Sequence, residues 1–254
     1  MLKERKNLRK VIAVAICLAG SVTMFAQETG VVINGVTWAT RNVGAPGTFA
    51  ASPESSGMFY QWNRPTAWAT TGNVTGWDSS NPTGTTWETV NDPSPAGWHV
   101  PTKTDFDKLL DATKVDYLWT NVNGINGGRF TDKTTGNSIF LPAVGDRGDY
   151  YEGSLFGAGV TGYYWSSANI DSNNAYILSF RSDFAIFGAG YKVFGYSIRT
   201  VKDGSTGINE VSVDKENATV TGYFDILGRK LTEEPTKGIY IIQYDNGKTK
   251  KIMK

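Results

Sequence analysis

Cysteine and histidine are almost absent from this chain of 254 residues, which holds one of each. Cys17 lies in an N-terminal segment that we expect to be removed, so the remaining chain has no disulfide, no thiolate nucleophile and no cysteine metal site. A serine–histidine–aspartate set would have to use His99. His99 sits between Trp98 and Val100 with no partner nearby in sequence, which favours a structural histidine over a general base. Because cofactor-binding glycine loops are also missing, we expect no enzyme and no cofactor.

Long apolar runs are equally scarce, and the one clear run follows a basic N-terminus. Five basic residues precede the apolar segment that begins at Val11, and Ala26 ends a suitable cleavage site. This pattern predicts a secretory signal peptide over residues 1–26, leaving no integral membrane span after cleavage. A lipoprotein signal at Cys17 is the alternative, but Ile16 stands where that pattern needs a small residue.

A basic stripe is also lacking. Residues 1–26 take five of the 25 basic residues and one of the 24 acidic residues, so the remaining chain carries a net charge of −3. We therefore expect no nucleic-acid partner. Glycine, with 29 residues, and the aromatic residues, at 13% of the chain, are abundant. This composition is typical of a rigid, loop-rich extracellular protein and not of a disordered one.

The pattern along the chain divides it into a large body and a small tail. All eight tryptophans lie between Trp38 and Trp165, and a Gly/Ser-type linker is expected at 204–207. The body, residues 27–203, begins with a predicted hairpin over 30–38 whose turn is Asn34-Gly35. A long loop without periodicity covers 63–95, a helix is expected over 103–113 behind a Thr102 cap, and 176–180 and 196–201 alternate as strands. The tail, 208–254, shows short strands separated by turns and predicts a small all-β sandwich.

Four blocks of the body, in order, carry a family likeness. Residues 36–44, 97–102, 164–167 and 197–202 together resemble the Fibrobacter succinogenes major paralogous domain. The resemblance implies an α+β fold of C-type-lectin-like type, with one main helix and short antiparallel strands. Members often have cysteines where this chain has Ala96 and Thr200, so no structural disulfide is implied.

The tail carries a second likeness. Residues 222–230, 237–242 and 246–251 are similar to the C-terminal sorting domain of type IX secretion cargo. This resemblance implies that the secretion machinery is a partner of the tail. It also implies that the protein is exported through the periplasm and is secreted or held at the outer-membrane surface.

Tryptophans of the long loop are the candidate binding residues. Aromatic faces stack on sugars and fill partner pockets, which makes four side chains candidates for a glycan or surface polymer: Trp62, Trp68, Trp77 and Trp87. The alternative is that they anchor the loop by packing, since large loops need internal contacts.

An acidic, glycine-rich loop is the candidate metal site. Asp146, Asp149 and Glu152 supply oxygen ligands of the kind that Ca²⁺ prefers. Their spacing does not match an EF-hand, and a solvated loop is the alternative that we favour.

The sequence therefore predicts an exported, non-catalytic binding module, with glycan or surface polymer as its ligand. A structural or adhesin-like component that binds proteins is the alternative, and an exposed apolar patch would favour it. A hydrolase is the least supported hypothesis, because it requires two carboxylates to share a cleft at catalytic separation.

Overall fold

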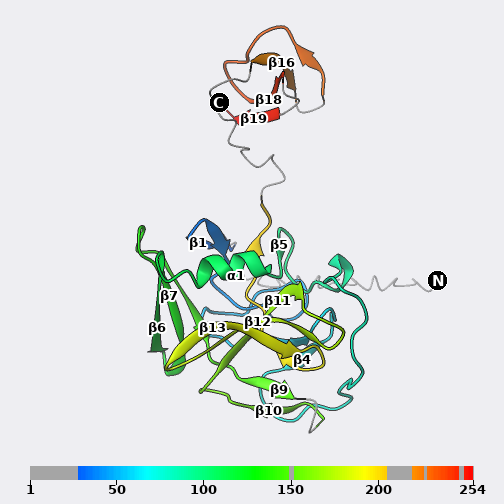
Figure 1. Cartoon of the computed structure of the whole chain (residues 1–254), viewed down its shortest axis with the longest axis vertical. Coiled ribbons are helices and arrows are strands. Elements are labelled where there is room, and N and C mark those ends of the chain that lie inside the picture. Colours follow the sequence, from blue (N-terminus) through cyan, green and yellow to red (C-terminus); the bar gives the residue numbers. More distant parts are fainter. Residues whose placement is uncertain (1–27, 149–151, 205–218, 226–227, 246–248, 254) are drawn as a thin grey trace, which may run out of the picture.

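The computed structural model describes residues 28–148, 152–204, 219–225, 228–245 and 249–253 (Figure 1). The protein is nearly all-β, with 45% strand and 5% helix, so the predicted C-type-lectin-like α+β fold is wrong. The α-helix α1 (Lys103–Leu109) is seven residues long and ends earlier than expected. The chain between α1 and residue 165 forms several strands that were not among the expected elements. Pairing between strands, which local pattern does not show, satisfies their backbone groups.

The opening hairpin forms as predicted. Strands β1 (Val31–Ile33) and β2 (Val36–Trp38) pair through a turn in which Asn34 and Gly35 both have positive φ, at 45° and 77°. Asparagine and glycine tolerate this left-handed backbone, which a two-residue hairpin turn requires. Strand β15 (Val201–Lys202) pairs with β2, and β5 (Trp98–His99) pairs with the other edge of β15, so the two ends of the body meet in one sheet.

Helix α1 begins at the predicted Thr102 cap, which is part of a capping box with Asp105. The Thr102 side chain accepts a hydrogen bond from the Asp105 backbone N–H, and the Asp105 carboxylate accepts from the Thr102 N–H at 2.9 Å. Phe106 and Leu109 are the buried side chains of the helix. Their burial against the strands compensates for the poor intrinsic stability of so short a helix.

Three further antiparallel sheets complete the body. The first contains, in spatial order, β10 (Ser154–Phe156), β9 (Asp146–Gly148), β14 (Gly195–Tyr196), β3 (Met58–Gln61) and β4 (Ala67–Ala69). The second contains β11 (Gly162–Asn169), β12 (Asn174–Arg181) and β13 (Phe184–Tyr191). The third contains β6 (Val115–Val122), β7 (Ile125–Asp132) and β8 (Ser138–Pro142). The predicted strand over 176–180 is the centre of β12. The predicted strand over 196–201 is instead divided between β14 and β15, which belong to different sheets.

The central strand β12 of the sheet β11–β12–β13 has buried side chains on both faces. Leu178 and Phe180 point into a core that includes Phe106. Ile177, which lies between Tyr176 and Leu178 in the strand, points into a second core that includes Trp62. Successive strand residues face opposite sides, so one strand serves two cores. This central sheet holds the helix on one face and the long loop on the other.

A buried polar network joins the two ends of the body. The fully buried Arg199 donates to Asn42 Oδ1 at 2.9 Å and to the carbonyl oxygens of Ala39 and Phe140 at 3.2 and 3.0 Å. Asn42 in turn donates to the Tyr164 hydroxyl at 3.2 Å. These bonds replace the hydration that the guanidinium loses on burial.

The long loop over 63–95 is irregular, as predicted, apart from β4 and the 3₁₀ turn η1 (Thr89–Asn91). The tail forms a separate sheet in the order β17 (Lys230–Leu231), β16 (Val220–Asp225), β18 (Ile239–Tyr244) and β19 (Thr249–Met253). It is a single sheet within the described residues, so the predicted sandwich is wrong although the strands are present. The predicted signal peptide and most of the predicted linker lie outside the described residues.

Candidate functional site

Two of the four predicted binding tryptophans pack against each other beneath the long loop. Trp62 is fully buried, and its Nε1 donates to the Ser166 carbonyl oxygen at 3.1 Å. The Trp87 ring meets it edge-on at 5.6 Å between centroids, and Trp87 Nε1 donates to the Asn91 carbonyl oxygen at 3.2 Å. The buried Lys192 ammonium lies 4.3 Å from the Trp62 ring centroid, in cation–π contact. Trp62 therefore anchors the loop and presents no free face.

Trp68 and Trp77 form a second pair in the same loop. Both are half-buried, and their ring centroids are 4.8 Å apart. The Trp77 ring lies against Gly153 and Gly195 so closely that a Cβ at either glycine would come within 2.5 and 2.9 Å of it. These contacts account for packing, while a role of Trp68, Trp77 and Trp87 in ligand binding stays a prediction.

Arg147 secures this loop to β9. Its buried guanidinium donates to the backbone carbonyl oxygens of Ala69, Thr71, Gly72 and Gly153 at 2.6, 3.0, 2.8 and 2.6 Å. Burial lowers the pKa of Arg147. Because all four acceptors are backbone atoms, the arginine fixes the path of the chain at 69–72 whatever side chains stand there.

The predicted calcium ligands are only partly described. Asp146 is half-buried in β9, Glu152 is exposed, and Asp149 lies outside the described residues. Across the part of the chain that the structure describes, no three or more His, Cys, Asp or Glu side chains gather as a metal site. The calcium site stays a prediction.

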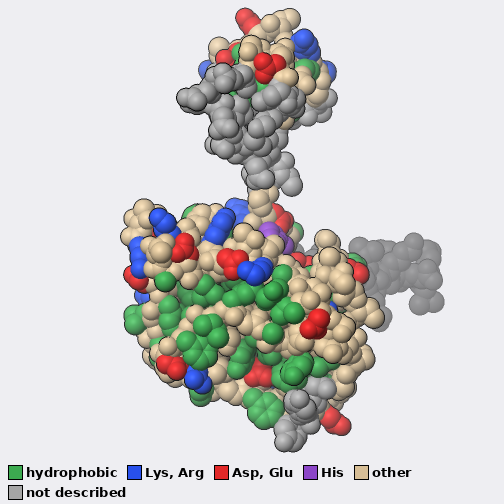
Figure 2. Space-filling model, viewed as in Figure 1, with side chains coloured by type: hydrophobic (Ala, Val, Ile, Leu, Met, Phe, Trp, Pro, Cys, Tyr) green, Lys and Arg blue, Asp and Glu red, His purple; other side chains and the backbone are tan. Residues whose placement is uncertain are grey.

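The structure reveals an aromatic face that the sequence analysis missed, formed by Tyr163, Tyr191, Phe194 and Phe156. Tyr191 and Phe156 are 50% and 44% exposed, and Tyr163 and Phe194 are half-buried. Tyr191 and Phe194 lie 5.5 Å apart between centroids, and the rings of Phe194 and Phe156 both border Gly148. Figure 2 shows that hydrophobic side chains also gather on the face of the body over β12 and β13.

A tyrosine and a carboxyl group lie beneath and beside this face. The buried Tyr196 ring is 5.3 Å from Tyr163 and 6.1 Å from Phe194 between centroids. Burial raises the pKa of Asp146 to about 6. Burial, and then the charge of Asp146, raises the pKa of Tyr196 well above its ordinary value, with smaller contributions from Tyr163 and Tyr191. Tyrosine hydroxyls and a titrating carboxyl group therefore lie among the aromatic rings, a combination that is enriched at functional sites.

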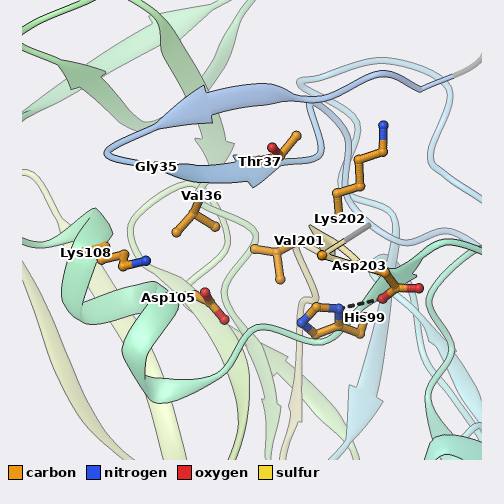
Figure 3. Close-up of a pocket in the computed structure, with 10 residues that line it drawn as sticks. Gly35, Val36, Thr37, His99, Asp105, Lys108, Val201, Lys202 and Asp203 are labelled. Atoms are coloured by element: carbon orange, nitrogen blue, oxygen red, sulfur yellow. Dashed lines mark hydrogen bonds and ion pairs between the residues drawn. The ribbon is translucent and has the colours of Figure 1, made fainter. Parts of the chain in front are cut away.

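A polar pocket of about 560 Å³ lies elsewhere on the body, between α1, the β1–β2 hairpin and the end of β15. His99 and Asp203 line it, and His99 Nδ1 is 2.7 Å from Asp203 Oδ1 (Figure 3). His99 is partly exposed, and the expectation that it is a structural histidine stays a prediction. Its partner lies 104 residues away in sequence and is brought there by the pairing of β5 with β15.

Both carboxylates that line this pocket hold a hydrogen bond to a neighbouring residue. The Asp203 carboxylate is hydrogen-bonded to His99. The Asp105 carboxylate accepts hydrogen bonds from the backbone N–H and from the hydroxyl of Thr102. Within the described chain, no hydroxyl is hydrogen-bonded to the other ring nitrogen of His99. A nucleophile–base pair of the serine-hydrolase kind is thus not assembled there.

No family model, curated protein or solved structure matches this chain. Among the described residues, no helix has the length and apolar character needed to cross a membrane. The site must therefore be interpreted from its own geometry.

Proposed function

We propose that the chain is an exported, non-catalytic module that binds a carbohydrate polymer outside the cell. The observation that carries this proposal is the aromatic face of Tyr163, Tyr191, Phe194 and Phe156, which is backed by Tyr196 and bordered by Asp146. The loop tryptophans contribute the rigid support beneath and beside it.

This combination suits a sugar for a physical reason. The C–H face of a pyranose ring stacks on an aromatic ring, while its hydroxyls need hydrogen-bond partners. Tyr163 and Tyr191 supply both functions, since each has an apolar ring and a hydroxyl group. Asp146 adds an acceptor when ionised and a donor when protonated. A few polar groups placed among aromatic rings fix orientation and provide specificity.

A structural or adhesin-like role, in which the same face binds a protein, is the alternative. An exposed apolar patch would serve that role as well. The tyrosine hydroxyls and the carboxyl group favour sugar, because a protein-binding core is typically depleted of charge.

Affinity electrophoresis of the protein in gels containing xylan, laminarin or pullulan tests the proposal. We expect one polymer to retard the protein, and Tyr191→Ala and Phe156→Ala each to weaken binding about tenfold, the equivalent of about 1.4 kcal/mol. Leu118→Ala removes an exposed apolar side chain from β6, away from the face, and serves as the control. Equal retardation of all three variants would contradict the assignment of the face, and no retardation by any polymer would favour the protein-binding alternative.

The export half of the proposal concerns the tail and needs its own test. Deletion of residues 208–254 should leave the protein in the periplasm if the type IX machinery recognises the tail. Surface delivery of the truncated protein at the normal level would contradict this partner assignment. Trypsin shaving of intact cells followed by immunoblotting measures the outcome.

A further inference from the structure

We propose that the pocket beside α1 binds a small polyhydroxylated anion, such as a sugar acid. The inference does not rest on the proposed function, because the pocket shares no residue with the aromatic face. Its volume of about 560 Å³ lies within the range of small-molecule sites and is ample for one sugar unit.

Three side chains converge on the pocket. Lys108 and His99 approach from opposite sides, and the Asp105 carboxylate lies between them, whereas Lys202 extends away (Figure 3). Lys108 and Asp105 both come from α1, three residues apart and therefore on one side of the helix. His99 comes from β5, and Val36 and Val201 supply apolar lining.

The polar groups of the pocket differ in how far they are already satisfied. Asp203 is bonded to His99, and Asp105 Oδ2 is bonded to Thr102, whereas Asp105 Oδ1 has no partner in the described chain. The Lys108 ammonium likewise forms no hydrogen bond or ion pair with any described residue. A ligand between α1 and β5 would therefore meet the free Lys108 ammonium and one free carboxylate oxygen of Asp105.

These free groups select the ligand chemistry. A carboxylate is the natural partner of the Lys108 ammonium, and the Asp105 oxygen accepts a hydroxyl proton. His99 Nδ1 donates to Asp203, so its second nitrogen faces the ligand as an acceptor when the ring is neutral and as a donor when the ring is protonated. A hydroxy acid satisfies the three groups together, whereas a neutral sugar leaves the ammonium without its counter-charge.

Binding of D-glucuronate to the protein, measured by calorimetry at low ionic strength, tests the inference with D-glucose and sodium acetate as reference probes. We expect glucuronate to bind at least tenfold more tightly than either.

Two variants locate the site. Lys108→Met keeps the stem but removes the charge, and it should weaken glucuronate binding at least tenfold. Lys114→Met removes the same charge from an exposed position outside the pocket and should leave binding unchanged. Equal effects of the two variants, equal affinity for glucuronate and acetate, or no binding at about 20 mM glucuronate would each overturn the proposal. Loss of polymer binding in Tyr191→Ala with glucuronate binding retained would separate this site from the aromatic face.

Discussion

Replacing Asp146 with asparagine isolates one titration in the folded protein. The carboxyl group is half-buried in β9 beside Tyr196, and burial raises its pKa from 3.8 to about 6. Asparagine has nearly the same shape but no charge, so Asp146→Asn removes the cost of burying the ionised group while preserving the packing. The difference in stability between the two proteins should then depend on pH.

The size and sign of that difference follow from the shift. Between pH 3.8 and about 6 the folded protein holds a proton that the unfolded chain has released, so the stability of the wild type falls as the pH rises through this window. The rise in the pKa of Asp146 from 3.8 to about 6 corresponds to about 3 kcal/mol of unfolding free energy. We expect Asp146→Asn to be more stable than the wild type by up to about 3 kcal/mol at about pH 8 and to match it at about pH 3.5.

Urea unfolding followed by tryptophan fluorescence measures this difference. All eight tryptophans lie between Trp38 and Trp165, so the signal reports on the body and not on the tail. Other titrating groups are common to both proteins and cancel in the comparison. A stability difference that stays constant from about pH 3.5 to about pH 8 would refute the argument that ionised Asp146 is costly. A cost that is confirmed would support a functional reason for retaining this carboxyl group.

Three further predictions concern the elements that hold the site. Thr102→Ala should lower stability by about 1 kcal/mol through loss of the helix cap, seen as a fall of about 2–4 °C in Tm. Arg147→Met should leave four carbonyl oxygens without their donor and lower stability by about 3 kcal/mol, with faster tryptic cleavage after Arg64 in the loop; an unchanged cleavage rate would contradict the clamp. Trp77→Ala should cost about 3 kcal/mol in urea unfolding if the ring is a packing anchor, and a cost near zero with loss of polymer retardation would instead favour the predicted binding role.

Local features of the fold were predictable from sequence. The Asn34-Gly35 turn and the Thr102 cap came from residues within a few positions of each other, and both are present. Backbone conformation at such places depends on φ preferences and short-range hydrogen bonds, which the adjacent residues set by themselves. The tail strands were recognisable for the same reason, through their alternation and their turns.

The fold class and the site depended on contacts that no local pattern reveals. The expected α+β fold was wrong because the chain between α1 and β11 pairs into long strands, and strand pairing is decided by distant partners. His99 appeared isolated because Asp203 lies 104 residues away. Phe156 and Tyr191 gave no signal as a pair, because Phe156 lies on β10, which joins the sheet of β14 through the pairing of β10 with β9 and of β9 with β14.

The sequence by itself determined the turns, the helix start, the scarcity of catalytic residue types and the abundance of aromatic side chains. Only the tertiary structure decided which aromatics are anchors and which are exposed. Trp62 is enclosed and Tyr191 is half-exposed, although both are large aromatic residues that flank glycine- and polar-rich segments. The physical reason is that burial depends on what packs against a side chain, and those neighbours come from strands far apart in the chain.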